Sequence, residues 1–171
     1  GKQHAYYPDS LMPFEIEKKY LVLPQRLERE VSLAEHTFKR IAQGYLASSD
    51  VVVVRVRVDQ ERGYLTIKQR SSGIKRLEIE RDISLEEAKE LLELCTQNRV
   101  EKHRYFIPYS KHTIELDVFQ EANNGLILAE VEFEHEDDAS AFCPPDWFSD
   151  EVSGDLRYYN HYLSEHPFTS W

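Results

Sequence analysis

Charged side chains occupy every second position in several short segments of the chain. Residues 14–20, FEIEKKY, place Glu15, Glu17 and Lys19 in this way. Successive side chains of a β-strand point to opposite faces, so these three would share one face. Grouped carboxylates offer the oxygen ligands that Mg²⁺ or Mn²⁺ prefers, whereas grouped Arg and Lys side chains donate to phosphate oxygens. A strand of this kind could therefore contribute to a metal or phosphate site.

Later segments group charges of one sign on one face. Same-face basic pairs are Arg55 with Arg57 and Lys102 with Arg104. Same-face acidic groups are Glu115 with Asp117, and Glu130 with Glu132 and Glu134. Residues two apart in a strand lie about 6–7 Å from each other, so like charges there repel. A closed barrel with both sets in its lumen would hold a metal–polyphosphate complex, whereas the alternative is an ordinary sheet with one wet face and one packed face.

The elements that must position these residues are mostly strands, because the dominant hydrophobic period is two. The pattern predicts about eight strands, over residues 14–22, 42–47, 51–58, 64–70, 74–80, 101–106, 113–119 and 126–134. The turn Asn123–Gly125 is a hairpin signal before the last of them. Helices are predicted over residues 27–40, 84–95, 136–142 and 156–163. The second of these helices has Ser84 and Glu87 in the positions of a capping box.

Composition restricts the classes of partner. The chain has 171 residues, of which 41% are hydrophobic, and this is enough to bury the core of one domain. Its formal net charge of −10 argues against binding to duplex nucleic acid, which normally requires a basic excess. The longest apolar run, residues 51–54, is far too short to span a membrane. We therefore expect neither a nucleic-acid nor a membrane partner.

The two cysteines and the chain start give further expectations. Cys95 and Cys143 have no metal-ligand spacing and indicate a reduced, cytoplasmic protein without a disulfide framework. The only methionine is Met12, so residues 1–12 are interpreted as a tag or an N-terminal extension, and residues 13–171 as a single domain.

A set of motifs in fixed order gives the chain a family resemblance. They are E-x-E-x-K at 15–19, QGYL at 43–46, RVR at 55–57, LTIK at 65–68, RLEIE at 76–80, KHRY at 102–105, ELDVF at 115–119, GLILAEVEFE at 125–134 and PDWFSDEVSGDLRYYN at 145–160. By these motifs, residues 14–163 resemble the CYTH superfamily, also called triphosphate tunnel metalloenzymes. The last motif is most similar to the bacterial inorganic triphosphatases, although Ser153 stands where threonine is usual and Phe148-Ser149 where Leu-Gly is common.

The resemblance implies a mainly β fold, namely an eight-stranded antiparallel closed barrel with a charged interior and helices packed outside. The implied metal ligands are Glu15, Glu17, Asp117, Glu130 and Glu132. The implied substrate-binding residues are Lys19, Arg55, Arg57, Lys68, Arg76, Lys102 and Arg104. Lys19 and Tyr45 are the implied catalytic residues, and the alternative for Tyr45 is a packed barrel tyrosine. Glu78, Glu80 and Glu115 would orient basic residues or hold a second cation, and Arg157 and Asn160 would help to close one mouth.

The activity implied by the resemblance is Mg²⁺- or Mn²⁺-dependent hydrolysis of inorganic triphosphate to pyrophosphate and phosphate. Two alternatives use the same tunnel: a class IV adenylyl cyclase, and a nucleoside or thiamine triphosphatase. A third belongs to another class, a polyphosphate-binding module without catalysis. The number of metal ions and the oligomeric state stay open, with a homodimer as one alternative.

Overall fold

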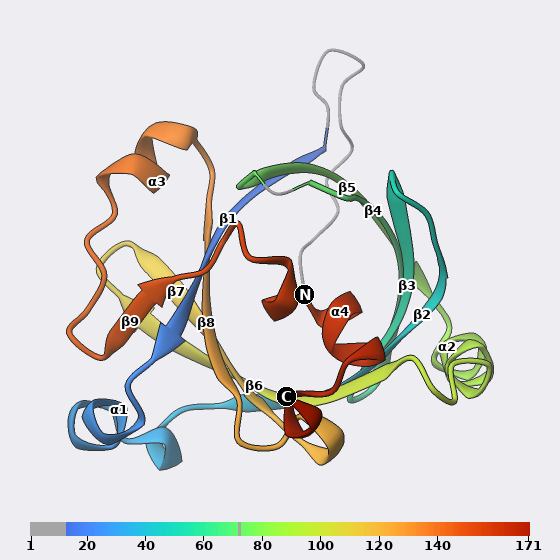
Figure 1. Cartoon of the computed structure of the whole chain (residues 1–171), viewed down its shortest axis with the longest axis horizontal. Helices are drawn as coiled ribbons and strands as arrows, with labels where there is room; N and C mark the ends of the chain where they lie inside the picture. The colour runs from blue at the N-terminus through green and yellow to red at the C-terminus, as the bar shows by residue number, and fades with distance from the viewer. Residues whose placement is uncertain (1–12, 72) are drawn as a thin grey trace.

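Eight antiparallel strands close into a barrel in the computed structural model, which describes residues 13–71 and 73–171 (Figure 1). The strands are β1 (Phe14–Val22), β2 (Phe38–Ser48), β3 (Val52–Asp59), β4 (Arg62–Gln69), β5 (Lys75–Ile83), β6 (Arg99–Tyr109), β7 (His112–Phe119) and β8 (Ile127–Phe133). They follow the order β5-β4-β3-β2-β6-β7-β8-β1, and β1 pairs back onto β5. The predicted closed barrel is confirmed, whereas the interpretation of residues 1–12 lies outside the described residues.

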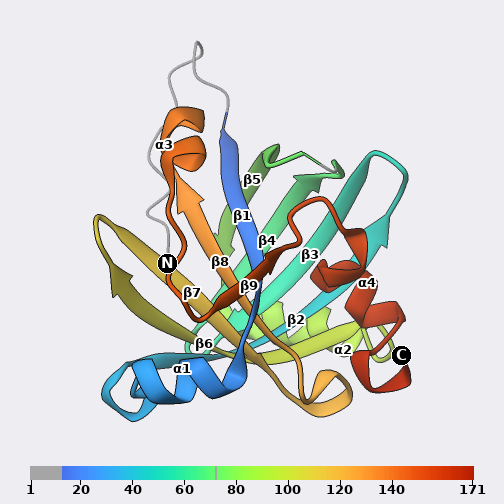
Figure 2. The same cartoon turned by 60° about the vertical axis from the view of Figure 1, so that its left-hand side comes forward.

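Strand β1 has three partners along its length. Its first residues pair with β5, from Phe14 opposite Leu77 to Ile16 opposite Lys75. Beyond Ile16, β1 no longer pairs with β5. A short ninth strand, β9 (Phe148–Glu151), pairs instead with the last residues of β1 (Figure 2). The sequence analysis missed β9, because four residues are too few to show a clear alternation. On its other edge β1 pairs with β8, which places Glu17 opposite Glu132.

Within the described ranges, four α-helices accompany the barrel: α1 (Pro24–Glu30), α2 (Leu85–Glu93), α3 (Glu136–Ala141) and α4 (Asn160–Glu165). The predicted capping box of α2 is confirmed, because the Ser84 hydroxyl accepts from the Glu87 amide at 3.0 Å and the Glu87 carboxylate accepts from the Ser84 amide at 3.1 Å. The prediction of α3 is also confirmed, and the last predicted helix is a 3₁₀ turn at Leu156–Tyr158 followed by α4. No helix of the described residues is long and apolar enough to cross a membrane.

The prediction of one helix over residues 27–40 is wrong after Glu30. Helix α1 begins at Pro24, whose fixed φ suits a first turn, and it buries only Leu27. A single 3₁₀ turn follows, and β2 begins at Phe38 because Phe38 and its neighbours pair with β6, with Phe38 opposite Tyr105. Tertiary pairing thus overrides the local helical pattern of residues 31–40.

Two of the three apolar clusters lie outside the barrel wall. One cluster joins the outer faces of β1, β7 and β8 to α1 and α3, and its largest members include Tyr20, Trp147 and Phe148. A second packs α2 against the outer face of β3 through Val56 and Leu92. Helix α4, in contrast, falls within the outline of the barrel in Figure 1, and its residues line the cavity described below. The third cluster lies inside one end of the barrel, where Phe119 and Leu128 share the inward faces of β7 and β8 with the charged residues and pack with Leu163 of α4. The rest of the interior is left mainly to polar and charged side chains.

Candidate functional site

All eight barrel strands contribute side chains to one interior cavity of about 550 Å³. Tyr45 and every predicted substrate-binding residue line this cavity, as do the predicted metal ligands other than Asp117. The alternation of each strand explains this placement, since charged residues two apart share the inward face and apolar residues pack outward. The residues that the sequence grouped strand by strand thus come together around one space.

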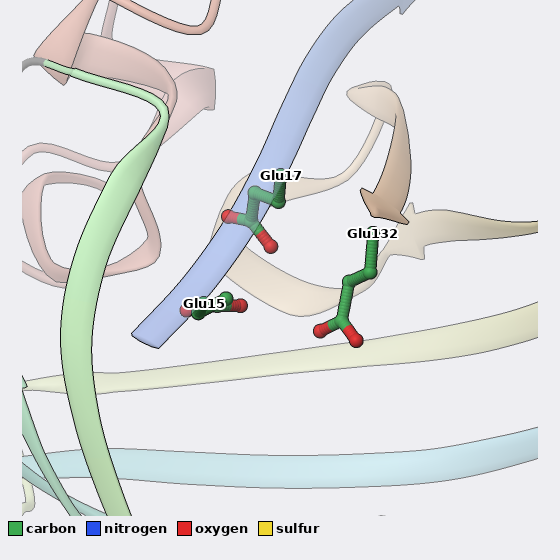
Figure 3. A group of neighbouring side chains, drawn as sticks. All are labelled: Glu15, Glu17 and Glu132. Atoms are coloured by element: carbon green, nitrogen blue, oxygen red, sulfur yellow. The ribbon is translucent and has the colours of Figure 1, made fainter. Parts of the chain in front are cut away.

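Three glutamates gather on one wall of the cavity. Glu15 and Glu17 extend from β1 and Glu132 from β8, and one carboxylate oxygen of each lies within 4.8 Å of the others (Figure 3). Burial raises the pKa of Glu17 well above its usual range, and the charges of Glu130 and Glu15 add to this effect. Two oxygens on opposite sides of Mg²⁺ lie about 4 Å apart, at ~2.1 Å each. The donor chemistry and the spacing of the three carboxylates therefore fit a hard divalent cation.

The other two predicted metal ligands contact basic side chains. Arg104 binds both oxygens of Asp117, at 2.7 and 2.8 Å, and Lys102 lies 2.8 Å from the same carboxylate. Glu130 lies 3.3 Å from Lys19 and 3.4 Å from Arg104. Burial by itself would raise the pKa of Glu130, but the positive charges of Lys19 and Arg104 outweigh it, so the pKa lies well below its usual range. Both residues lie outside the three-glutamate cluster, and metal ligation by them stays a prediction.

Most of the predicted substrate-binding residues already have carboxylate partners. Lys68 lies 2.8 Å from Glu15, Arg76 lies 3.1 Å from Glu17, and Arg55 lies 3.5 Å from Glu80. Arg104 lies 2.7 Å from Glu115. Glu80 and Glu115 therefore contact the basic residues that they were expected to orient, as does Glu78 at 3.9 Å from Arg55. These pairs hold buried positive charge in place around the cavity.

Arg57 differs from the other cations of the cavity. Its Nε donates to Gln43 Oε1 at 3.0 Å, and no carboxylate of the described residues forms an ion pair with it. Burial lowers the pKa of Arg57 to about 10, and the neighbouring charges of Arg55 and Arg104 contribute. The guanidinium is still protonated at neutral pH, so Arg57 presents to a ligand a positive charge that has no ion-pair partner among the described residues.

The two predicted catalytic residues lie in the cavity in different settings. The Tyr45 hydroxyl accepts from Gln43 Nε2 at 2.9 Å, and its ring packs edge-on against His161. The Lys19 ammonium donates to the Tyr158 carbonyl at 3.1 Å and lies 4.4 Å from the centre of the Tyr159 ring. Catalytic roles for Tyr45 and Lys19 stay predictions.

The C-terminal segment covers part of the cavity in a way that the sequence only partly indicated. Asn160 accepts from Lys102 at 2.8 Å and from Gln43 at 3.2 Å, whereas Arg157 is exposed and pairs with Asp155. The sequence analysis missed Gln43 and Tyr159 as lining residues. Gln43 could have been found, because it is two residues before Tyr45 on the same strand. Tyr159 lies in an irregular segment, where no period indicates which side chains face inward.

The family model described as CYTH domain matches residues 13–160. The chain belongs to the CYTH family. Its curated CYTH relatives include an inorganic triphosphatase of Acetivibrio thermocellus, 42% identical over 158 residues that cover 92% of this chain and 97% of the relative. An inorganic triphosphatase of Nitrosomonas europaea is 37% identical over 155 residues, 88% of this chain and 96% of the relative. The resemblance inferred from the motifs is confirmed.

Solved structures support the same relationship. The crystal structure of an inorganic triphosphatase aligns with a TM-score of 0.64 and 35% identity, over 88% of this chain and 94% of that chain.

In the CYTH barrel of this protein, β8 and β3 are separated by three strands in either direction around the ring. Glu132 on β8 and Arg57 on β3 therefore belong to opposite walls. A ligand that carries both a cation and phosphate charge could contact both walls at once.

Proposed function

We propose that the protein hydrolyses inorganic triphosphate to pyrophosphate and phosphate with the aid of a divalent cation. The observation that carries this proposal is a single cavity in which three clustered glutamates lie opposite Arg57, whose guanidinium forms no ion pair with a carboxylate of the described residues. Two curated relatives that match nearly the whole chain are inorganic triphosphatases, which supports the same activity. A module that only binds polyphosphate would need the basic residues but not the acidic cluster.

The chain's own residues would hold the reactants in place, which is most of what phosphoryl transfer requires of a protein. Arg57 and the ion-paired basic residues bind the phosphate oxygens, and the partner carboxylates limit the movement of those basic groups. Glu15, Glu17 and Glu132 would hold Mg²⁺ or Mn²⁺, which when bound neutralises phosphate charge and makes a water molecule more acidic. The Lys19 ammonium would stabilise negative charge on the substrate near Glu130. The Tyr45 hydroxyl would orient substrate groups at the Gln43 side of the cavity.

The lining favours triphosphate over a nucleotide. Recognition of a base normally requires an apolar or aromatic surface with a few matched polar groups. Two of the aromatic rings in the lining already have partners, because Tyr159 stacks on Lys19 and Arg76, each 4.4 Å from the ring centre, and Tyr45 packs against His161. We also propose a cytoplasmic location, in line with two free cysteines, of which Cys143 is exposed.

The test is a side-by-side measurement of phosphate release from triphosphate, ATP and thiamine triphosphate, with Mg²⁺, with Mn²⁺ and with EDTA. We expect kcat/KM for triphosphate to exceed that for ATP by at least about 100-fold, or ~2.7 kcal/mol of transition-state discrimination, and no turnover in EDTA. ATP turnover within tenfold of triphosphate, or formation of cyclic AMP, would favour one of the alternative enzymes. Tight binding without any release of phosphate would favour the non-catalytic module.

A further inference from the structure

Tyr64 on β4 has a buried hydroxyl group without a hydrogen-bond partner among the described residues. Its side chain lines the cavity and is only 4% exposed, and its hydroxyl oxygen is among the few buried polar atoms that nothing in the described chain satisfies. A buried hydroxyl that has lost water and gained no partner destabilises the fold. Phenylalanine would fill the same space without this penalty. The part of the chain that the structure describes therefore leaves this hydroxyl without the acceptor that a buried donor normally has.

The position of Tyr64 in the sheet places it beside Arg57. The two residues are directly opposite each other in the pairing of β3 with β4, and both line the cavity. Side chains directly opposite on one face have Cβ atoms about 4.5–5.5 Å apart. Arg57 has no carboxylate partner, as described above. A neutral donor and a charged donor thus lie side by side, and neither has an anionic acceptor within residues 13–71 and 73–171.

Two further donors in the cavity are in the same state. The Nε atoms of Arg55 and Arg76 are buried and have no hydrogen-bond partner in the described chain. A cavity with this surplus of donors fits a ligand that offers many acceptor oxygens and no donors. A polyphosphate chain is such a ligand, whereas a water molecule accepts from at most two donors and brings two donors of its own.

We propose that the Tyr64 hydroxyl donates a hydrogen bond to a phosphoryl oxygen of the substrate. This oxygen belongs to the phosphoryl group that Arg57 binds or lies next to the oxygen that Arg57 binds. This inference rests on the proposed function for the identity of the ligand as triphosphate. It adds to the cavity a substrate-binding residue that carries no charge. Such a donor contributes to affinity and to the placement of one phosphoryl group without increasing the repulsion among the cations.

The first test is the affinity of Tyr64→Phe for inorganic triphosphate, measured by calorimetry in EDTA so that hydrolysis does not interfere. We expect the dissociation constant to rise about tenfold relative to the unmodified protein, as for the loss of one hydrogen bond to a charged group. The matched control is Tyr20→Phe, since Tyr20 is also a buried tyrosine of a barrel strand but packs outside the cavity against Phe148. We expect this control to bind triphosphate like the unmodified protein.

The second test is the thermal stability of the ligand-free proteins. If a tyrosine hydroxyl stabilises the fold, its removal lowers the unfolding temperature of the protein. We expect Tyr64→Phe to unfold at the same temperature as the unmodified protein or at a higher one, because an unsatisfied buried group has been deleted. The proposal would be overturned if Tyr64→Phe and the unmodified protein bound triphosphate equally well, or if neither bound it. A lower unfolding temperature of Tyr64→Phe would also overturn it. Binding that depends on Tyr64 without any hydrolysis would instead contradict the proposed function and leave the role of Tyr64 intact.

Discussion

The charged residues of the cavity differ in whether their charge is compensated. Asp117 and Glu130 are surrounded by cations, so their carboxylates are stabilised in the charged form. Glu17 has Arg76 as a partner, yet burial and the nearby carboxylates still raise its pKa. A cation bound between Glu15, Glu17 and Glu132 would relieve the repulsion among them. These three residues are therefore the ones whose replacement tests metal binding most directly.

Glu132→Gln should abolish metal-dependent turnover while leaving the fold intact. Glutamine keeps the size and polarity of the side chain but lacks the negative charge that a divalent cation requires. We expect phosphate release at saturating Mg²⁺ to fall at least about 100-fold, with an unchanged circular dichroism spectrum. Glu134→Gln is the matched control, because Glu134 is exposed just beyond the end of β8 and does not line the cavity. Wild-type turnover in Glu132→Gln would exclude this residue as a ligand.

Lys102 should make triphosphate binding depend on pH. Burial lowers the pKa of Lys102 to about 7, and Arg104 lowers it further while Asp117 opposes the shift. A bound polyanion favours the ammonium form, so binding takes up a proton at any pH where the free lysine is neutral. We expect the dissociation constant to rise with pH above about 7, measured by calorimetry between pH 6.5 and 9.

The comparison protein for this experiment is Lys102→Met. The ligand's own titration is common to both proteins, so the difference between the two pH profiles reports the lysine alone. Arg104 still binds both oxygens of Asp117 in this variant, which keeps that carboxylate paired. Parallel profiles for the two proteins would show that Lys102 stays charged throughout this pH range.

At the scale of elements, the contact between α2 and β2 depends on a glycine. A Cβ atom built on Gly44 would lie 2.5 Å from the Cβ of Cys95 and 3.2 Å from a methyl group of Leu92. The contact with Cys95 is too close for real atoms, and the Cβ of Cys95 cannot turn away because it is fixed to the backbone, whereas the contact with Leu92 is only tight. The glycine in QGYL is therefore required by the close approach of the segment that ends α2.

Gly44→Ala should destabilise the protein by about 1–3 kcal/mol, because α2 must move away from the barrel wall. The measurement is urea unfolding followed by circular dichroism. Gly73→Ala serves as the control, since a Cβ there would meet only the Ser71 hydroxyl oxygen, at 3.5 Å. We expect Gly73→Ala to change the free energy of unfolding by less than about 0.5 kcal/mol. Equal stability of the two variants would show that α2 adjusts its position without cost.

At the scale of the whole molecule, the polar and apolar groups are arranged differently from those of a small globular protein that has one central apolar core. The barrel encloses its charges together with one apolar cluster at its end, and the other two apolar clusters lie between the barrel wall and the covering segments. Burial of so many charged groups is unfavourable unless they are paired or bind ions. The ligand-free barrel should consequently gain stability from any ion that neutralises the cavity.

Triphosphate and Mg²⁺ should each raise the unfolding temperature. A ligand present at about 100 times its dissociation constant stabilises the folded state by ~2.7 kcal/mol. For a chain of this size we expect a rise of roughly 5–10 °C with triphosphate in EDTA, measured by differential scanning calorimetry. Mg²⁺ alone should also raise the unfolding temperature in the unmodified protein, but not in Glu132→Gln. A shift with Mg²⁺ in that variant would place the cation elsewhere.

The sequence by itself determined which residues share a face of each strand, and its family motifs predicted the closed barrel. Charged and apolar residues alternate with a period of two, which is the period of side chains along a β-strand. Glu15 and Glu17, or Arg55 and Arg57, therefore share a face in any sheet that forms. The capping box of α2 is similarly local, since Ser84 and Glu87 satisfy each other's amides within one turn. Such features depend on neighbours in sequence and can be predicted from them.

Only the tertiary structure decided which charges meet. The approach of Glu132 to Glu17 follows from the register of strands far apart in the chain, as does the lack of a carboxylate partner for Arg57 among the described residues. The same holds for the end of α1, where pairing of Phe38 with β6 outweighs a helical pattern. Strand register and ring closure are set by the sum of many contacts between distant segments, and no single segment contains that information.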